Sequence, residues 1–176
     1  ALFDRAMAGN MPIAATVDKA LRLAESEQNM RVLEQISVSL IEAVDMVQRL
    51  RPETNEVLPG LLKRIEGFSL MGAEFAETQD LKRLWFNTFL SVVSSEAGLG
   101  TARALLDGEA EIDGIELSPE NRWRLLIIMS RHNADDIEEL LKAEIERDSS
   151  DFGQRSLLSA RAAAPNLANK EFWVHE

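Results

Sequence analysis

The sequence predicts an all-α protein in which antiparallel helical pairs stack as a HEAT- or armadillo-like α-α superhelix. Apolar residues recur every three or four positions in successive windows of ten to twenty residues, which is typical of amphipathic helices. No segment alternates as a strand does, because Val92-Val93 and Ile127-Ile128 lie inside windows of helical period. Short turns separate the windows, as in arrays of paired helices. We therefore expect one helical domain over residues 1–176, without an exact repeat.

The first helices are expected within residues 12–77. Pro12 opens a helix that runs to about residue 24, since proline suits the first helical position. A second helix covers residues 30–50, and Arg51-Pro52 ends it because proline disfavours helical geometry in the preceding residue. The apolar stripe of this second helix, which must be buried, consists of Leu33, Ile36, Leu40, Val44 and Val47.

A third helical region covers residues 55–77, and Gly67 and Gly72 are candidate breaks in it. The next helix is apolar on more than one face, which predicts a central position covered on several sides. Its apolar residues are Leu81, Leu84, Trp85, Phe86, Phe89, Leu90, Val92 and Val93.

Capping signals place the boundaries in the second half of the chain. A helix over residues 99–106 ends at Asp107-Gly108, where glycine supplies a left-handed cap. After a connector over residues 109–117 that contains Gly114, Ser118-Pro119-Glu120 begins the next helix with an N-cap serine, a first-position proline and an acid in the first turn.

The segment Asn133-Ala134-Asp135-Asp136 repeats that capping logic and predicts another helix start. In this helix Glu138 and Lys142 form a favourable pair one turn apart. A further helix is expected over residues 152–164, and Pro165-Asn166 starts the last one. The buried stripe after Asp136 consists of Ile137, Leu140, Leu141 and Ile145.

Composition excludes several classes of partner. The formal net charge is −11, with 30 Asp and Glu against 19 Lys and Arg, which argues against a nucleic-acid partner. The chain has no Cys, so disulfides and Cys-ligated zinc are excluded, and a reducing cytoplasm is the expected location. No uncharged apolar run approaches the roughly 20 residues of a membrane helix, so no membrane partner is expected. The first residues lack an initiator Met, and residues 170–176 stop inside a helical pattern; we therefore expect a chain truncated at both ends.

The two histidines do not predict a metal site. His132 and His175 lie far apart, and neither has a second ligand at one-turn spacing. His175-Glu176 resembles the start of a zincin motif, but the sequence ends before a second His could appear. His132 directly precedes Asn133, and we expect it to cap the preceding helix.

Other candidate motifs favour structural roles. One candidate is Met71-Gly72-Ala73-Glu74-Phe75, which has the residues of an aminopeptidase substrate-binding motif but in the wrong order. Another is Gly98-Leu99-Gly100-Thr101, which lacks the strand that precedes a nucleotide-binding motif. Arg122 and Arg124 flank a tryptophan, and one of them is expected to pair with an acid. The expected core anchors are Trp85, Phe86, Phe89, Trp123 and Trp173. The sequence therefore predicts no catalytic, cofactor-binding or metal-binding residue and identifies no peptide-contacting residue.

The order and spacing of many segments resemble the C-terminal helical domain of bacterial aminopeptidase N, which belongs to the zinc-dependent gluzincin aminopeptidases. That domain is related to the C-terminal domain of endoplasmic-reticulum aminopeptidases. The resemblance is strong over residues 79–173, and the helical pattern of residues 12–77 fits the same domain. The matching segments are Leu105-Leu106-Asp107-Gly108, Gly114-Ile115, Asn121-Arg122-Trp123, residues 144–148, Gly153, residues 160–165, Lys170 and Trp173.

The resemblance implies an accessory role. In that family the zinc, its His-Glu-x-x-His ligands and the amine-binding motif lie in an earlier thermolysin-like domain, so zinc is expected in the parent's catalytic domain and no cofactor in this chain. The implied role is a bowl of paired helices that encloses the active-site chamber of an enzyme removing N-terminal residues from peptides. Its implied partners are the catalytic domain of the same polypeptide and peptide substrates. The alternative is a freestanding helical-repeat scaffold that binds another protein through its concave face.

Overall fold

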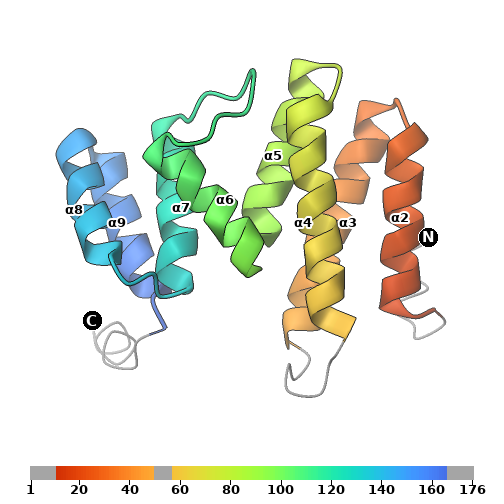
Figure 1. Ribbon diagram of the computed structural model, residues 1–176, viewed down its shortest axis with the longest axis horizontal. Coiled ribbons are helices and arrows are strands. Elements are labelled where there is room, and N and C mark those ends of the chain that lie inside the picture. Colours follow the sequence, from red (N-terminus) through yellow and green to blue (C-terminus); the bar gives the residue numbers. More distant parts are fainter. Residues whose placement is uncertain (1–10, 50–56, 166–176) are drawn as a thin grey trace. The chain divides into compact units, whose positions relative to one another are not determined.

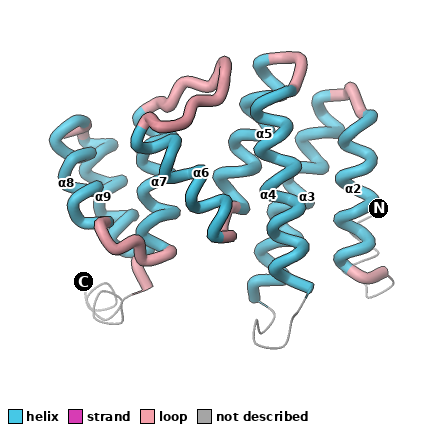
Figure 2. The backbone as a smooth tube through the Cα atoms, viewed as in Figure 1, coloured by secondary structure: helices cyan, strands magenta, loops and turns pink. Residues whose placement is uncertain are grey.

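The computed structural model describes residues 11–49 and 57–165, and the regular secondary structure of these residues is entirely helical (Figure 1). The all-α prediction is thereby confirmed. The tube in Figure 2 shows only helices and loops in the described segments. Within one of these loops, an isolated antiparallel bridge joins Ile112 and Ile115. The chain divides into two compact units. Of the described residues, unit 1 contains those up to Gly98 together with Ile112–Ile115, and unit 2 contains Leu99–Glu111 and those from Glu116 onward.

Unit 1 is built from α2 (Ile13–Ser26), α3 (Met30–Arg49), α4 (Val57–Phe75) and α5 (Gln79–Val92). Successive helices alternate in direction, so that α2–α3 and α4–α5 form two antiparallel hairpins (Figure 1). The hairpins lie against each other, since α2 contacts α4 and α3 contacts α5. This arrangement is compatible with the predicted stacking of helical pairs, whereas the superhelix stays a prediction.

The apolar stripes predicted from the sequence form the core of unit 1. All five members of the α3 stripe are buried, and Leu40 is fully so. On α5 the buried residues cover more than one face, as expected for a central helix: Trp85, Phe86, Thr88, Phe89, Leu90 and Val92. One polar pair lies within this core. The Thr88 hydroxyl donates to the Leu84 carbonyl at 2.8 Å, so Ser37 must donate in its 2.6 Å hydrogen bond to Thr88.

The candidate breaks at Gly67 and Gly72 were wrong, because α4 continues through both glycines. A Cβ on Gly72 would stand 2.5 Å from Cγ of Trp85, closer than van der Waals contact permits. The ring of Phe68 meets the same indole edge-on at a centroid distance of 5.0 Å. Gly72 is therefore a point of close approach between α4 and α5, and not a helix terminator.

The helix α6 (Glu96–Asp107) begins three residues earlier than predicted. Ser95 caps it, since the Ser95 hydroxyl accepts a hydrogen bond from the Gly98 amide at 3.1 Å. The buried carboxylate of Glu66 on α4 supports this start by accepting the backbone amides of Ser94 and Ser95 at 2.8 and 2.9 Å. An acceptor from a distant helix thus satisfies donors at the helix N-terminus, which a local sequence pattern does not reveal.

The predicted connector after α6 is fixed to α5 within unit 1. Gly114 has a φ of +80°, and its carbonyl accepts a hydrogen bond from the Gln79 side chain. The Lys82 ammonium reaches both the backbone carbonyl and the carboxylate of Asp113, at 2.8 and 3.2 Å. The glycine in the connector is therefore required by a left-handed turn.

Unit 2 contains most of α6 together with α7 (Pro119–Arg131), α8 (Ile137–Arg147) and α9 (Asp151–Ala163). In this unit α7 packs on both α8 and α9. The side chain of Ser118 accepts from the Asn121 amide and caps α7 as predicted. The expected helix over residues 152–164 is confirmed as α9, whereas the helix predicted to follow Pro165 lies outside the described residues.

The helix start predicted at Asn133–Asp136 is confirmed, since α8 begins at Ile137, but Asn133 itself is not its N-cap. Asn133 has a φ of +54° and follows the last residues of α7. Its backbone amide donates to the Ser130 carbonyl, and the Ala134 amide donates to the Met129 carbonyl. These two bonds form a Schellman motif, in which asparagine tolerates the left-handed position. Gly108 terminates α6 in the same way, as predicted, with a φ of +76°. The N-cap of α8 is Asp136, whose side chain makes no capping hydrogen bond.

Candidate functional site

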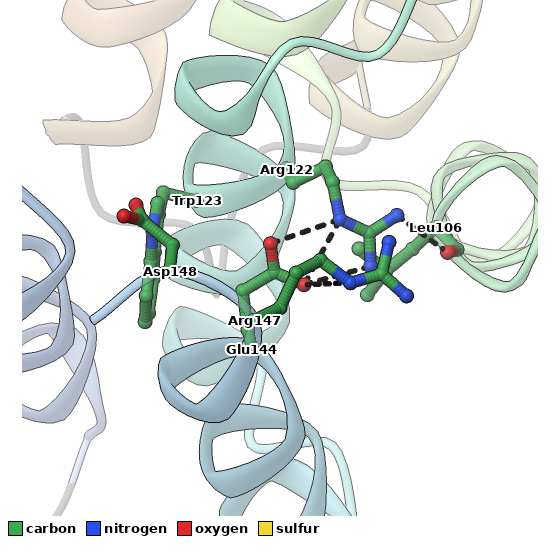
Figure 3. A network of polar contacts seen from close by, with 6 residues as sticks. All are labelled: Leu106, Arg122, Trp123, Glu144, Arg147 and Asp148. Atoms are coloured by element: carbon green, nitrogen blue, oxygen red, sulfur yellow. Dashed lines mark hydrogen bonds and ion pairs between the residues drawn. The ribbon is translucent and has the colours of Figure 1, made fainter. Parts of the chain in front are cut away.

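Among the described residues of unit 2, the most buried ion pair joins Arg122 on α7 to Glu144 on α8 (Figure 3). The side chain of Glu144 is 3% exposed and that of Arg122 is 17% exposed. Nε of Arg122 lies 2.9 Å from both carboxylate oxygens, and Nη2 lies 2.7 Å from Oε2. Multiple charge-assisted hydrogen bonds of this kind fix the relative position of two helices. The prediction that one of Arg122 and Arg124 pairs with an acid is confirmed for Arg122.

The Arg122 guanidinium also provides a hydrogen-bond donor for a backbone carbonyl at the end of α6. Nη1 of Arg122 donates to the Leu106 carbonyl at 3.2 Å, a group that has no partner within the last turn of an α-helix (Figure 3). Nε of Arg147 lies 4.0 Å from Glu144 Oε2, and the side chain of Arg147 is 65% exposed. The ion pair thus joins α6, α7 and α8, and the N–H groups of Arg122 donate to Glu144 and to the Leu106 carbonyl. This arrangement is structural and offers no nucleophile or general base.

A second polar contact fixes the turn between α8 and α9. The indole of the buried Trp123 donates from Nε1 to Asp148 Oδ2 at 2.9 Å. Asp148 Oδ1 accepts from the Ser150 hydroxyl at 2.6 Å, and Ser150 in turn accepts from the Gly153 amide as the N-cap of α9. The hydrogen bonds from Ser150 and then from Trp123 hold the pKa of the Asp148 carboxyl below its ordinary value of 3.8.

This depressed pKa predicts an acid-sensitive turn. A carboxylate whose folded-state pKa is lowered contributes stability above its unfolded pKa and loses it as the pH falls through the folded value. We expect the free energy of unfolding to decrease below about pH 4, the unfolded pKa of an aspartate. D148N should flatten that decrease, and W123F should flatten it in part. Urea titrations from pH 6 to pH 3 would measure the slopes, and an unchanged slope in D148N would refute the assignment.

Another ion cluster ties α6 to the start of α8. The two outer nitrogens of Arg103 bind the carboxylate of Asp136 at 2.8 and 2.7 Å, and its Nε contacts Asp107. The hydrogen bond to Arg103 lowers the pKa of Asp136, and the hydrogen bonds to Asp136 and Asp107 raise the pKa of Arg103. Asp136 is therefore committed to this contact, which accounts for its failure to cap α8 with its own side chain.

The described residues of unit 1 form a groove of about 990 Å³ between α2 and α4, which extends to the start of α5. Its apolar residues include Leu33 and Trp85, which are nearly buried, and Met71 and Phe75, which are 63% and 75% exposed. Two turns close one end of the groove: Glu25, Glu27 and Gln28 lie where α2 joins α3, and Glu77 and Thr78 lie where α4 joins α5. We call this space the α2–α4 groove. It combines an apolar lining with an acidic end.

The two histidines and the many acidic residues were the candidate metal ligands of the sequence. Within residues 11–49 and 57–165, no three His, Asp or Glu side chains gather closely enough to hold a metal ion. His132 occupies the C-cap position of α7, where its backbone amide donates to the Ile128 carbonyl, so its predicted position at the helix end is confirmed. His175 and Trp173 lie outside the described residues. The other four predicted aromatic anchors are buried, with Trp123 1% exposed.

The helices of the described segments were compared with the requirements of a bilayer span. None of them combines the necessary length and apolar character.

Comparison with known proteins places these features in a family context. The family described as "ERAP1-like C-terminal domain" matches residues 1–174. The chain is also 30% identical over 152 residues to the protein named Aminopeptidase N from Streptomyces lividans. That alignment covers 84% of this chain but 17% of the relative, so the chain spans less than a fifth of the length of the curated relative that it matches.

Proposed function

This chain belongs to the ERAP1-like C-terminal domain family, and we propose that it encloses the active-site chamber of a zinc-dependent aminopeptidase. The family match over residues 1–174 is the observation that carries the proposal. Together with the aminopeptidase N relative, it identifies the chain as a C-terminal domain of an aminopeptidase N-like protein. The finer role, which is to limit the access of substrates, is our inference.

In this proposal the reaction belongs to another part of the same polypeptide. A catalytic domain would supply the zinc and its His-Glu-x-x-His ligands, and the bound metal would activate water for attack on the first peptide bond. The residues described in this chain provide no ligand set for such a metal, so we assign no step of the reaction to them. We further propose peptides as the substrates and the cytoplasm as the location of the parent protein.

The contribution of this chain would be a rigid enclosure. The ion pair of Arg122 with Glu144 and the contact of Trp123 with Asp148 fix the helices of unit 2 at defined positions. In unit 1, the close contact between Gly72 and Trp85 does the same for α4 and α5. Helical arrays held in this way present stable surfaces, which can exclude substrates by size without taking part in chemistry.

Substrate size is the property that tests the proposed enclosure. We would give the full-length parent protein an unfolded peptide and a stably folded domain that begins with the same residues, and follow release of the first amino acid by mass spectrometry. We expect release from the peptide and little or none from the folded domain. Equal rates on both substrates would contradict a role in limiting access.

The alternative of a freestanding scaffold makes a different prediction about the gene. A gluzincin aminopeptidase requires a His-Glu-x-x-His segment upstream in the same reading frame, because its zinc ligands come from there. A reading frame without that segment would favour the scaffold.

A further inference from the structure

We propose that the connector over residues 109–117 is a strap that makes the two units unfold as one. Its middle, Ile112–Ile115, belongs to unit 1, whereas the residues directly before and after that middle belong to unit 2. The chain therefore passes from unit 2 into unit 1 and back within a single loop, which Figure 2 shows between α6 and α7. The strap is independent of the aminopeptidase assignment, because it concerns the folding of this chain alone.

The middle of the strap is a turn whose shape requires glycine. The Ile115 amide donates to the Ile112 carbonyl at 2.9 Å, which closes a four-residue turn. Gly114 occupies the third position of this turn with a φ of +80°, a conformation that other residues adopt only at a cost. A Cβ on Gly114 would also stand 2.6 Å from Oε1 of Gln79. Glycine thus allows both the turn and its close contact with α5.

Three contacts anchor this turn in unit 1. Ile112 is 5% exposed, so its apolar side chain is removed from water. The Gln79 side chain donates to the Gly114 carbonyl. The Lys82 ammonium donates to the Asp113 carbonyl at 2.8 Å and lies 3.2 Å from the Asp113 carboxylate. That carboxylate belongs to a side chain that is 99% exposed, and exposed ion pairs add little. The bond from the charged Lys82 to the backbone is therefore the stronger part of this contact.

The two flanks of the strap are held within unit 2. Before the turn, the amides of Glu109 and Ala110 both donate to the Ala104 carbonyl of α6, at 2.9 and 3.1 Å. After the turn, the Ser118 amide donates to the Glu116 carbonyl at 3.0 Å, and Ser118 caps α7. Only short stretches of chain separate these contacts from the turn, so the strap has little slack.

The anchors have their full effect only when both units are folded. If unit 1 unfolds, Gln79 and Lys82 no longer lie side by side on α5, and the turn loses its partners. If unit 2 unfolds, the flanks are free, and anchoring the turn must then order a flexible chain at a cost in conformational entropy. The free energy of the anchors is thus a coupling free energy, and each unit is more stable when the other is folded.

Pulsed hydrogen exchange along a urea titration reads the two units separately in the same molecules. Mass spectrometry assigns the exchanged peptides, so that α4 and α5 report unit 1 and α7 to α9 report unit 2. We expect one shared midpoint in the wild type and two midpoints in Q79A/K82M. K63M is the matched control, because Lys63 is an exposed lysine of α4, and it should keep the shared midpoint.

A second variant loosens the strap without altering an anchor. Gly-Ser repeats inserted beside Glu111 and Glu116 lengthen both flanks, and the longer chain between the fixed points should also separate the midpoints. Because these insertions lie in exposed loop positions, the helices of both units keep their own sequences. Circular dichroism of the folded variants should match that of the wild type.

Cleavage by a glutamate-specific protease reports release of the strap itself. Glu111 and Glu116 are exposed beside the turn, and cleavage of a transiently opened segment follows the population of the open form. Q79A/K82M should raise the initial rate of cleavage after these residues about tenfold, since it removes two hydrogen bonds, one of them from a charged donor. D113N keeps the bond to the backbone carbonyl and should change the rate about twofold or less.

Three results would overturn the proposal. Separate midpoints in the wild type would show that the strap does not couple the units. A cleavage rate that Q79A/K82M leaves unchanged would show that these side chains do not hold the strap. A shared midpoint that persists in both the double variant and the insertion variant would assign the coupling to α6, which runs across the boundary between Gly98 and Leu99. None of these results bears on whether the parent is an aminopeptidase.

Discussion

The R122M variant is expected to lose about 3–5 kcal/mol of unfolding free energy, the cost of leaving a buried charge without its partner. Glu144 is 3% exposed and receives three contacts of 2.7–2.9 Å from Arg122. Arg147 is a poor substitute for Arg122, because its Nε is 4.0 Å away from Glu144 on an exposed side chain. The Leu106 carbonyl would lose its donor as well. Urea denaturation followed by circular dichroism measures the loss.

The matched control is the double variant R122M/E144L, which removes both charges and fills the space with apolar groups. Replacing a buried ion pair by apolar residues of similar volume is often neutral or stabilising, so the double variant should recover most of the lost stability. The coupling energy from the complete double-mutant cycle then isolates the pair. A double variant as unstable as R122M would show that the two side chains act separately.

The G153A variant is expected to lose about 3 kcal/mol, at the upper end of overpacking costs. A Cβ on Gly153 would stand 2.0 Å from the carbonyl oxygen of Asp148 and 2.9 Å from its Cγ. The first of these atoms belongs to the backbone of the α8–α9 turn and cannot rotate away. We therefore expect the start of α9 to shift and the contact of Trp123 with Asp148 to weaken. Chemical denaturation measures the loss of stability, and fluorescence in a W85F/W173F background, where Trp123 is the single tryptophan, measures the local change.

G100A is the control for that substitution. Gly100 lies inside α6, and a Cβ there would meet nothing within 4 Å. Alanine in a helix interior is favoured over glycine by about 0.5–1 kcal/mol, so G100A should stabilise the protein. If G153A and G100A changed stability in the same direction, the close approach at Gly153 would not limit the choice of residue there.

The sequence predicted the helices well where the signal was local. The apolar stripe of α3, the serine cap of α7 and the glycine cap of α6 all depend on residues within a few positions of one another. Asn133 shows the limit of such reasoning, because asparagine suits both a helix start and a left-handed helix end. The neighbouring residues were compatible with either role, and the structure uses it to end α7.

Contacts between distant residues were not predictable in the same way. Glu66 accepts the amides of Ser94 and Ser95 from 28 and 29 positions away, and nothing in its own helix distinguishes it from a surface glutamate. Gly72 resembled a helix break in the sequence, because the close contact with Trp85 that requires a glycine there is not visible in the local pattern. The α2–α4 groove depends on two hairpins lying side by side, so Met71 and Phe75 could not be recognised as its lining.

In the proposed function, aminopeptidase activity resides in the full-length parent protein and not in this chain. An unfolded peptide would be incubated with the full-length parent protein and, separately, with the 176-residue chain, each with and without a zinc chelator. We expect release of the first amino acid by the parent alone, and loss of that release on chelation. Chelator-sensitive release by the 176-residue chain, or no release by the parent, would contradict it.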